Sequence, residues 1–220
     1  MSYSSCLITF GLFMKFNGSI VVGDKSAHEA TFHIPQLFYF SLFCLVFSWP
    51  VFLFELYGFL RCAISHKKKV VSIAILMAII VFSNTLVHPY LLADNRHYTF
   101  YVWNRLYGPK IYFRYFMIPI YMWALYVMVK YLYNKHDISF LIMYIPCLAA
   151  VLVTQKLVDV RYFLIPYIIF KLKMEYTSNI SLFLIAELIT NLMMNIFVFY
   201  RFFYRPIPWA DYEELQRLIW

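Results

Sequence analysis

The sequence has few charged residues and few glycines. Only 14% of its 220 residues are charged and five are glycine, whereas 63% are hydrophobic and 22% are aromatic. An average soluble domain carries about 25% charged residues, so this composition excludes an ordinary soluble protein. A membrane-spanning helix needs about 20 mostly apolar residues. The chain therefore has room for five or six such helices and for no separate soluble domain.

The sequence also lacks the short motifs of common nucleotide, serine-nucleophile and metal sites. It contains no P-loop, no G-x-G-x-x-G and no G-x-S-x-G sequence, which argues against nucleotide binding and a nucleophilic serine. Acidic and histidine side chains lie close together between Asp24 and His33, but neither H-E-x-x-H nor D-x-D occurs, so no metal is expected. The four cysteines form no C-x-x-C pair, and we expect them to be packing residues.

Basic residues outnumber acidic ones, with 19 Lys and Arg against 11 Asp and Glu, which gives a formal net charge of +8. In a membrane chain this excess is typical of loops that face anionic lipid headgroups. Membrane lipid is therefore an expected partner, and nucleic acid is not. No pattern in the sequence predicts an oligomeric state.

The hydrophobic runs predict an all-α, polytopic membrane protein, because lipid leaves backbone groups no partner outside their own helix. The chain, residues 1–220, is predicted to be one transmembrane region. Pro50, Pro119 and Pro146 are predicted to kink their helices. The apolar run 162–170 is half a span long, so it is predicted to lie at the interface or to re-enter against protein. The predicted spans lie near 3–16, 37–60, 70–87, 111–133, 140–158 and 180–200.

Lysine density indicates the orientation of the chain. Lys67, Lys68 and Lys69 form one short basic cluster, which predicts a cytosolic loop. The two sides of the membrane carry equal numbers of basic residues when the C-terminal tail is placed on the side of this cluster. The density of lysines, not their number, therefore indicates the orientation. The loop 88–110 then lies outside the cytosol. Two N-x-[ST] sequons, at Asn17 and Asn179, fall on that side, where glycosylation can occur.

Four consecutive polar residues, Asp94, Asn95, Arg96 and His97, follow the 70–87 run. Arginine offers a planar fork of donors that suits phosphate, and histidine exchanges a proton near neutral pH. We predict that this group binds a phosphorylated lipid headgroup or a sugar, because four adjacent polar side chains exceed what membrane anchoring needs. For Arg105, Lys110 and Arg114 the preferred interpretation is an aromatic belt with snorkelling arginines. His88, Arg105, Asp24 and His28 are secondary candidates for binding the same headgroup or sugar.

Two further polar features lie in the second half of the chain. Arg161 begins a segment, Arg161-Tyr-Phe-Leu-Ile-Pro166, that echoes Arg114-Tyr-Phe-Met-Ile-Pro119. It is either the partner of a phosphate or of Asp159, or an interface anchor, and the pattern favours neither. In the last span Glu187, Asn191 and Asn195 recur every four residues and form one polar stripe. An acid in a span indicates function, but the preferred interpretation is interhelical hydrogen bonding with a neutral Glu187.

Three segments resemble one enzyme family. Leu-Leu-Ala-Asp94-Asn-Arg-His-Tyr-Thr-Phe-Tyr-Val-Trp103 resembles a signature of the terminal alpha-1,2-glucosyltransferases of lipid-linked oligosaccharide assembly. The segment 17–30, followed by Pro35-Gln-Leu-Phe-Tyr39, and the segment 155–167 resemble two other blocks of that family, in the same order. The similarity continues to the C-terminal Gln216-Arg-Leu-Ile-Trp220.

The resemblance implies a multi-pass enzyme of the endoplasmic reticulum membrane. Such enzymes transfer the terminal alpha-1,2-linked glucose from dolichyl-phosphate glucose to the diglucosylated oligosaccharide on dolichyl diphosphate, with no cofactor besides the donor. The fold would be part of the membrane glycosyltransferase fold of the polyprenyl-phosphate-sugar class, with the 88–110 loop lumenal. Arg96, His97 and Arg161 would bind the donor phosphate or order the acceptor sugars. Asp94 would orient Arg96 and is a weaker candidate for the catalytic base.

The chain differs from that family in length. Family members are about twice as long, and the resemblance places their catalytic carboxylate in a lumenal loop of the N-terminal half. This sequence resembles the C-terminal half, and Glu29-Ala-Thr-Phe-His-Ile-Pro-Gln36 is a partial echo of that loop. The alternative function is therefore that of a non-catalytic, half-length membrane protein that binds dolichol lipids or a membrane partner.

Overall fold

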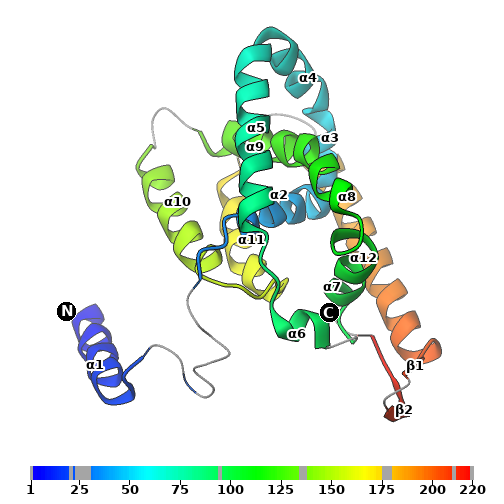
Figure 1. Ribbon diagram of the computed structural model, residues 1–220. Helices are drawn as coiled ribbons and strands as arrows, with labels where there is room; N and C mark the ends of the chain where they lie inside the picture. Colours follow the sequence, from blue (N-terminus) through cyan, green and yellow to red (C-terminus); the bar gives the residue numbers. More distant parts are fainter. Residues whose placement is uncertain are drawn as a thin grey trace.

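The computed structural model describes residues 2–19, 22, 31–93, 96–133, 138–174, 180–209 and 212–218. It is predominantly helical (Figure 1). The helices are α1 (Ser2–Asn17), α2 (Pro35–Phe47), α3 (Trp49–Phe54), α4 (Leu56–Ser65), α5 (Lys67–Asn84), α6 (Pro89–Ala93), α7 (Tyr98–Val102), the π-helical turn η2 (Trp103–Tyr107), α8 (Ile111–Phe116), α9 (Ile118–Leu132), α10 (Ile138–Leu152), α11 (Arg161–Lys173) and α12 (Ile180–Tyr204).

The predicted all-α class is confirmed, apart from one short hairpin. After α12 the chain forms a short antiparallel hairpin of β1 (Ile207–Trp209) and β2 (Tyr212–Gln216), in which Ile207 lies opposite Gln216. Among the described residues, two helical stretches are long and apolar enough to cross a membrane, Ile111–Leu132 and Ser181–Tyr204. Three shorter helices, α2, α4 and α10, are also apolar. The structure therefore does not confirm the predicted five or six full spans.

The predicted span 37–60 is divided into three helices, α2, α3 and α4, with breaks at Ser48 and Glu55. Pro50 lies in the first turn of α3, where its missing N–H costs no helical hydrogen bond. At the second break Glu55 accepts hydrogen bonds from Lys130 Nζ (2.5 Å) and the Tyr131 hydroxyl (3.3 Å) of α9. A carboxylate that must reach partners on another helix explains why the hydrophobic run does not continue as one helix.

The other two prolines behave differently from each other. Pro119 lies in the first turn of α9, directly after a break at Met117, as the predicted kink requires. Pro146 lies inside α10, which continues through it without a break.

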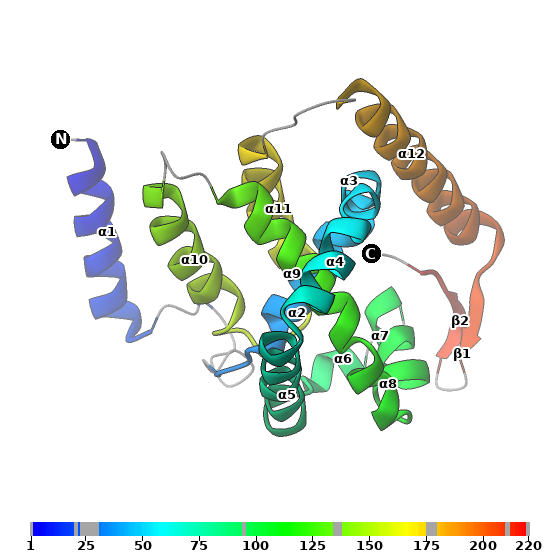
Figure 2. The ribbon, with the colours of Figure 1, turned by 90° about the horizontal axis from the view of Figure 1, so that it is seen from above.

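The core lies between α2 and α9, against which α3, α10 and α11 pack. Cys44 is fully buried there, as expected of a packing residue, whereas Cys6 and Cys147 are exposed. α1 lies at the edge of the molecule, apart from α2 and α9 (Figure 2).

The half-span 162–170 lies within α11, which packs against protein but runs along α2 instead of lying at the interface or re-entering. Phe163 contacts Phe40 and Phe43 of α2, and the Tyr167 hydroxyl donates to the Phe47 carbonyl. α11 therefore runs beside α2 and α3 in the same direction.

α12 returns in the opposite direction and carries the tail with it. Phe183, near its start, contacts Phe54 at the end of α3, and Thr190 accepts a hydrogen bond from Trp49 at the start of α3 (3.0 Å). Further along, the charge of Arg201 acts on Tyr98 of α7. The β1–β2 hairpin consequently lies at the same end of the molecule as α6 and α7, away from the lysine cluster (Figure 1). The prediction that placed the tail with that cluster is wrong, because α11 carries the chain back along α2.

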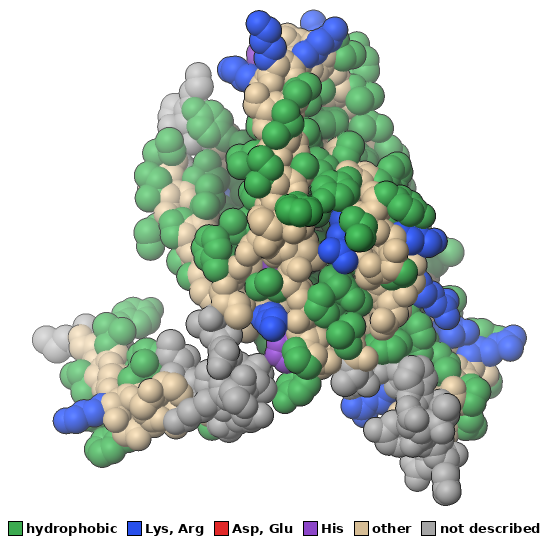
Figure 3. Space-filling model, viewed as in Figure 1, with side chains coloured by type: hydrophobic (Ala, Val, Ile, Leu, Met, Phe, Trp, Pro, Cys, Tyr) green, Lys and Arg blue, Asp and Glu red, His purple; other side chains and the backbone are tan. Residues whose placement is uncertain are grey.

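Basic side chains mark the opposite end. Figure 3 shows lysine and arginine side chains gathered where α4 meets α5, above a surface that is largely hydrophobic. Lys67, Lys68 and Lys69 are all exposed there.

The polar stripe of α12 has a basic partner. Lys171 of α11 donates to both carboxylate oxygens of Glu187, at 2.9 and 2.8 Å, and both side chains are largely buried. Interhelical hydrogen bonding of Glu187 is confirmed. The predicted neutral state is wrong, because the donor is a lysine that forms an ion pair with the carboxylate.

Candidate functional site

The predicted loop 88–110 is mostly helical. It contains α6, α7 and η2, which fold over the end of α2 and α9. Arg96 is exposed and His97 is half-buried between α6 and α7. Four predicted site residues and one sequon lie outside the described residues, namely Asp94, Asn95, Asp24, His28 and Asn179.

The structure brings His97 and Arg161 to one place, and Asp159 connects them. Asp159 accepts hydrogen bonds from the Arg161 backbone N–H (2.9 Å), from its Nε (3.0 and 2.9 Å) and from its Nη2. His97, from a distant part of the chain, acts on the same carboxylate by its charge. The sequence predicted Arg161 and His97 as parts of one binding site, and the role of both residues stays a prediction.

Asp159 stays ionised although it is largely buried. Burial raises the pKa of Asp159, but the hydrogen bonds and charge of Arg161 and the charge of His97 outweigh this effect, so that its pKa lies below the usual value. The Arg161 side chain is 74% exposed and that of Asp159 15%. The carboxylate therefore fixes one edge of a guanidinium group whose remaining surface faces outward.

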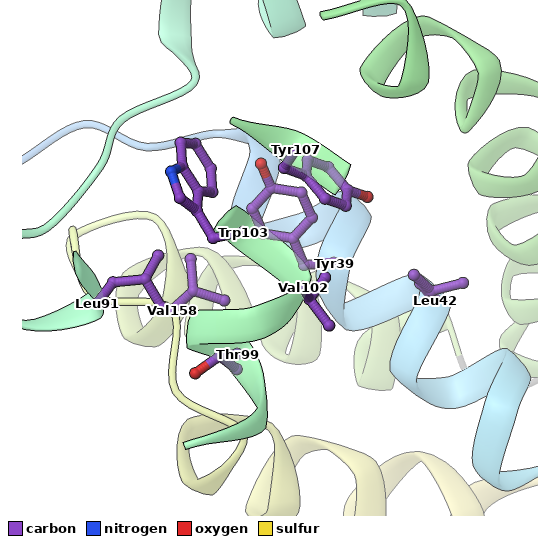
Figure 4. A pocket seen from close by; sticks show the side chains of 8 residues that line it. All are labelled: Tyr39, Leu42, Leu91, Thr99, Val102, Trp103, Tyr107 and Val158. Atoms are coloured by element: carbon purple, nitrogen blue, oxygen red, sulfur yellow. The ribbon is translucent and has the colours of Figure 1, made fainter. Parts of the chain in front are cut away.

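An apolar cavity of about 140 Å³ borders this cluster. Val158 precedes Asp159 and lines the cavity, and Thr99 and Val102 line it from α7, just after His97. Figure 4 shows the aromatic rings of Tyr39, Trp103 and Tyr107 on its other side. A charged cluster beside an apolar cavity suits a molecule with an anionic head and an apolar body.

η2 positions Trp103 for this cavity. The Gly108 N–H donates to the Trp103 carbonyl at 2.7 Å, which closes a π-helical turn. Arg114 Nε donates to the Tyr107 carbonyl (2.7 Å), and its guanidinium lies 5.3 Å from the Trp103 ring. Arg105 likewise lies 5.3 Å from the Tyr101 ring. These contacts agree with the anchoring role preferred for both arginines.

His88 has a structural position. It is buried, and its Nδ1 accepts a hydrogen bond from the Tyr90 N–H (3.1 Å) at the start of α6. Its ring also packs on the Tyr90 ring, with 4.8 Å between centroids. This geometry fixes the first turn of α6.

Sequence reasoning missed two buried polar residues, His33 and Gln36. Both are at most 1% exposed. Burial lowers the pKa of His33 to about 4, although the backbone of Gln155 and Lys156 favours its protonated form. Gln36 donates to the carbonyls of Gln155 (3.2 Å) and Leu157 (2.9 Å). The sequence indicated His33 only within the group of acidic and histidine side chains after Asp24, and Gln36 only within a segment that resembles the family, and it predicted burial of neither.

Comparison with known proteins gives one consistent result. The profile of the DIE2/ALG10 family matches residues 1–172. A protein of Drosophila melanogaster is 42% identical over 99% of this chain and 48% of its own length, and one of Rattus norvegicus is 40% identical over 99% and 46%. A protein of Arabidopsis thaliana is 30% identical over 97% and 43%. All three are named Dol-P-Glc:Glc(2)Man(9)GlcNAc(2)-PP-Dol alpha-1,2-glucosyltransferase.

The chain thus spans about half the length of these relatives. No solved structure matches it. The family profile covers most of the chain and the similarity to the relatives extends over nearly all of it, so the chain belongs to the DIE2/ALG10 family.

Proposed function

We propose that the chain forms one side of a glucosyltransferase site in the membrane of the endoplasmic reticulum. The reaction transfers the terminal alpha-1,2-linked glucose from dolichyl-phosphate glucose to the diglucosylated oligosaccharide on dolichyl diphosphate. The names of the relatives support this reaction. The chain spans about half their length, so we assign to it only one side of the site. The exposed Arg161 favours the side that meets the donor phosphate.

One observation carries this assignment. Arg161 is oriented by an ionised Asp159 at the edge of an apolar cavity, and the charge of His97 acts on the same carboxylate. A polyprenyl phosphate has an anionic head and an apolar chain, and an exposed guanidinium fork suits its phosphate oxygens.

The residues have separate roles in the proposed mechanism. The acceptor hydroxyl attacks the anomeric carbon of glucose, and the bond between that carbon and the phosphate oxygen breaks. Arg161, with Arg96 and His97, stabilises the negative charge that the departing dolichyl phosphate gains. Asp159 is a weak base because Arg161 occupies its oxygens, so we assign it to orienting Arg161. Asp94 is a weaker candidate for accepting the proton of the acceptor hydroxyl.

We place the 88–110 segment on the lumenal side, since the exposed Lys67–Lys69 cluster at the opposite end favours the cytosol. Dolichyl-linked substrates would then meet Arg161 at the lumenal membrane surface. An unglycosylated tag at Gly108 would contradict this orientation.

The experiment is complementation. The chain replaces the matching half of the Drosophila melanogaster relative, and the hybrid is expressed in cells that lack the terminal glucosyltransferase. The glucose residues on the lipid-linked oligosaccharide are then counted after hydrolysis. We expect triglucosylated product from the wild-type hybrid and a loss of roughly tenfold or more for Arg161→Met, which removes a charge-assisted contact to phosphate. Thr190→Val, which removes the hydrogen bond from Trp49 and the one to the Ala186 carbonyl, serves as the control. Equal product from Arg161→Met and wild type would refute the phosphate role.

The second candidate is a non-catalytic protein that binds dolichol lipids, and the exposed Arg161 side chain near an apolar cavity suits such a lipid without any reaction. In that case no variant yields triglucosylated product, yet the purified chain binds dodecyl phosphate more tightly than dodecyl maltoside. Arg161→Met would abolish that preference.

A further inference from the structure

A short extended segment before α2 joins two distant parts of the chain. The Thr31 and His33 N–H groups donate to the carbonyls of Thr154 (3.2 Å) and Val153 (2.8 Å), after the end of α10. On its other side the side chain of Asn84, at the end of α5, accepts from the Ile34 N–H and donates to the Phe32 carbonyl, each at 2.7 Å. We call residues 31–36 the splint.

Gln36 makes the splint's contact nearest to the candidate site. Its amide donates to two carbonyls, those of Gln155 and Leu157, which lie two residues apart in the irregular segment between α10 and α11. Buried carbonyls outside a helix need donors from elsewhere in the fold. One side-chain amide therefore determines where two backbone groups of this segment lie.

The segment that Gln36 holds leads directly to the charged cluster. Asp159 follows Leu157 by two residues, and Arg161, four residues beyond Leu157, is the first residue of α11. Asn84 contacts the other side of the splint and is the last residue of α5. After Asn84 the chain continues through His88 and α6 towards His97. The splint thus holds the start of the chain segment that leads to His97 and the segment that leads to Asp159.

We propose that Gln36 and Asn84 are positioning residues for the His97–Asp159–Arg161 cluster. Gln36 acts through Arg161, and Asn84 acts through His97. Neither touches the substrate. The proposal rests on the proposed function only where substrate binding is measured, because the positions of the two segments can be measured without it.

The first experiment needs no ligand. Hydrogen–deuterium exchange is compared between the purified wild-type chain, Gln36→Met, which keeps the side-chain length and removes the donors, and Thr190→Val as a control. We expect faster exchange in peptides covering 157–163, where the Arg161 and Tyr162 N–H groups are bonded to Asp159. Exchange in 181–204 stays unchanged. Asn84→Ala should raise exchange in 85–93 instead. Unchanged exchange in 157–163 of Gln36→Met overturns the proposal.

The second experiment measures binding of dodecyl phosphate, with dodecyl maltoside as the neutral probe. Arg161→Lys and Gln36→Met should each weaken dodecyl phosphate binding by roughly tenfold, and the double variant should be no weaker than Arg161→Lys alone, because one residue acts through the other. Combining Thr190→Val with Arg161→Lys should weaken dodecyl phosphate binding no further than Arg161→Lys does alone. If the double variant loses as much affinity for dodecyl phosphate as the product of the two single losses, Gln36 and Arg161 act independently and the proposal is overturned. If Arg161→Lys binds normally, the phosphate role fails while the exchange result still decides the positioning role.

Discussion

His33 should make the stability of the protein depend on pH. Its pKa is about 4 in the folded chain because the ring is buried, against 6.5 in an unfolded chain. Between these values the unfolded state binds more protons, so the free energy of unfolding falls as the pH drops from about 6.5 to about 4. The full loss is about 3 kcal/mol. We expect His33→Gln to flatten this part of the stability curve, measured as Tm against pH in detergent.

His66 provides the matched control for this measurement, because it is an exposed histidine at the end of α4. His66→Gln should leave the pH dependence as it is in the wild type. A full wild-type slope in His33→Gln would show that the neutral ring is not its source.

Gly108 should be required by the π-helical turn. A Cβ at this position would lie 3.1 Å from the Trp103 carbonyl oxygen and 3.3 Å from its Nε1. The carbonyl cannot retreat without loosening its 2.7 Å hydrogen bond from the Gly108 N–H. We expect Gly108→Ala to cost about 1 kcal/mol or more of stability. The measurement is thermal unfolding followed by tryptophan fluorescence. Gly11→Ala, at a position with no atom within 4 Å, should cost nothing by comparison.

At this scale the sequence identified charged residues better than neutral ones. Arg161 and His97 were predicted because a charge beside an apolar run demands a reason. Gln36 was not, because its partners are backbone carbonyls 119 and 121 residues away. Asp159 was weighed only as a partner for Arg161, since nothing in the pattern shows that His97 also approaches it.

At the scale of helices, hydrophobic runs predicted where helices lie but not how many a run contains. The run 37–60 appeared as one span because its polar residues, Ser41, Ser48 and Glu55, are few. A helix ends at Ser48 and another at Glu55, where these side chains contact the Tyr167 hydroxyl and Lys130. Such partners depend on the tertiary fold, so periodicity could not predict the breaks.

Removing one partner of the ion pair between α11 and α12 should destabilise the protein more than removing both. Lys171→Ala leaves the Glu187 carboxylate, 8% exposed, without its lysine, and an unpaired buried charge costs about 3–5 kcal/mol. The double variant Lys171→Met with Glu187→Met should recover most of this loss, because it leaves no charge behind. Unfolding by denaturant in detergent measures both. A double variant as unstable as Lys171→Ala would mean that the pair contributes attraction beyond its own desolvation cost.

At the scale of the molecule, two chemically different ends are separated by apolar helices. One end carries Lys67–Lys69, and the other carries α6, α7, the splint and the candidate cluster (Figure 1). The sequence predicted this separation and the side of the 88–110 segment relative to the lysines. It could not predict the side of the tail, because the segment 162–170 was expected to lie at the interface or to re-enter, whereas its contacts with Phe40, Phe43 and Phe47 place α11 along α2.

The tail and the 88–110 segment should therefore lie on the same side of the membrane. Glycosylation tags on flexible spacers are inserted singly after His66, after Gly108 and after Trp220, and each chain is tested for a mobility shift that endoglycosidase H reverses. Because α12 runs opposite to α3, the tags after Gly108 and Trp220 should behave alike and opposite to the tag after His66. With the lysine cluster in the cytosol, the first two are glycosylated and the third is not. If the tags after His66 and Trp220 behave alike, α12 does not cross the membrane in the direction that its contacts with α3 require.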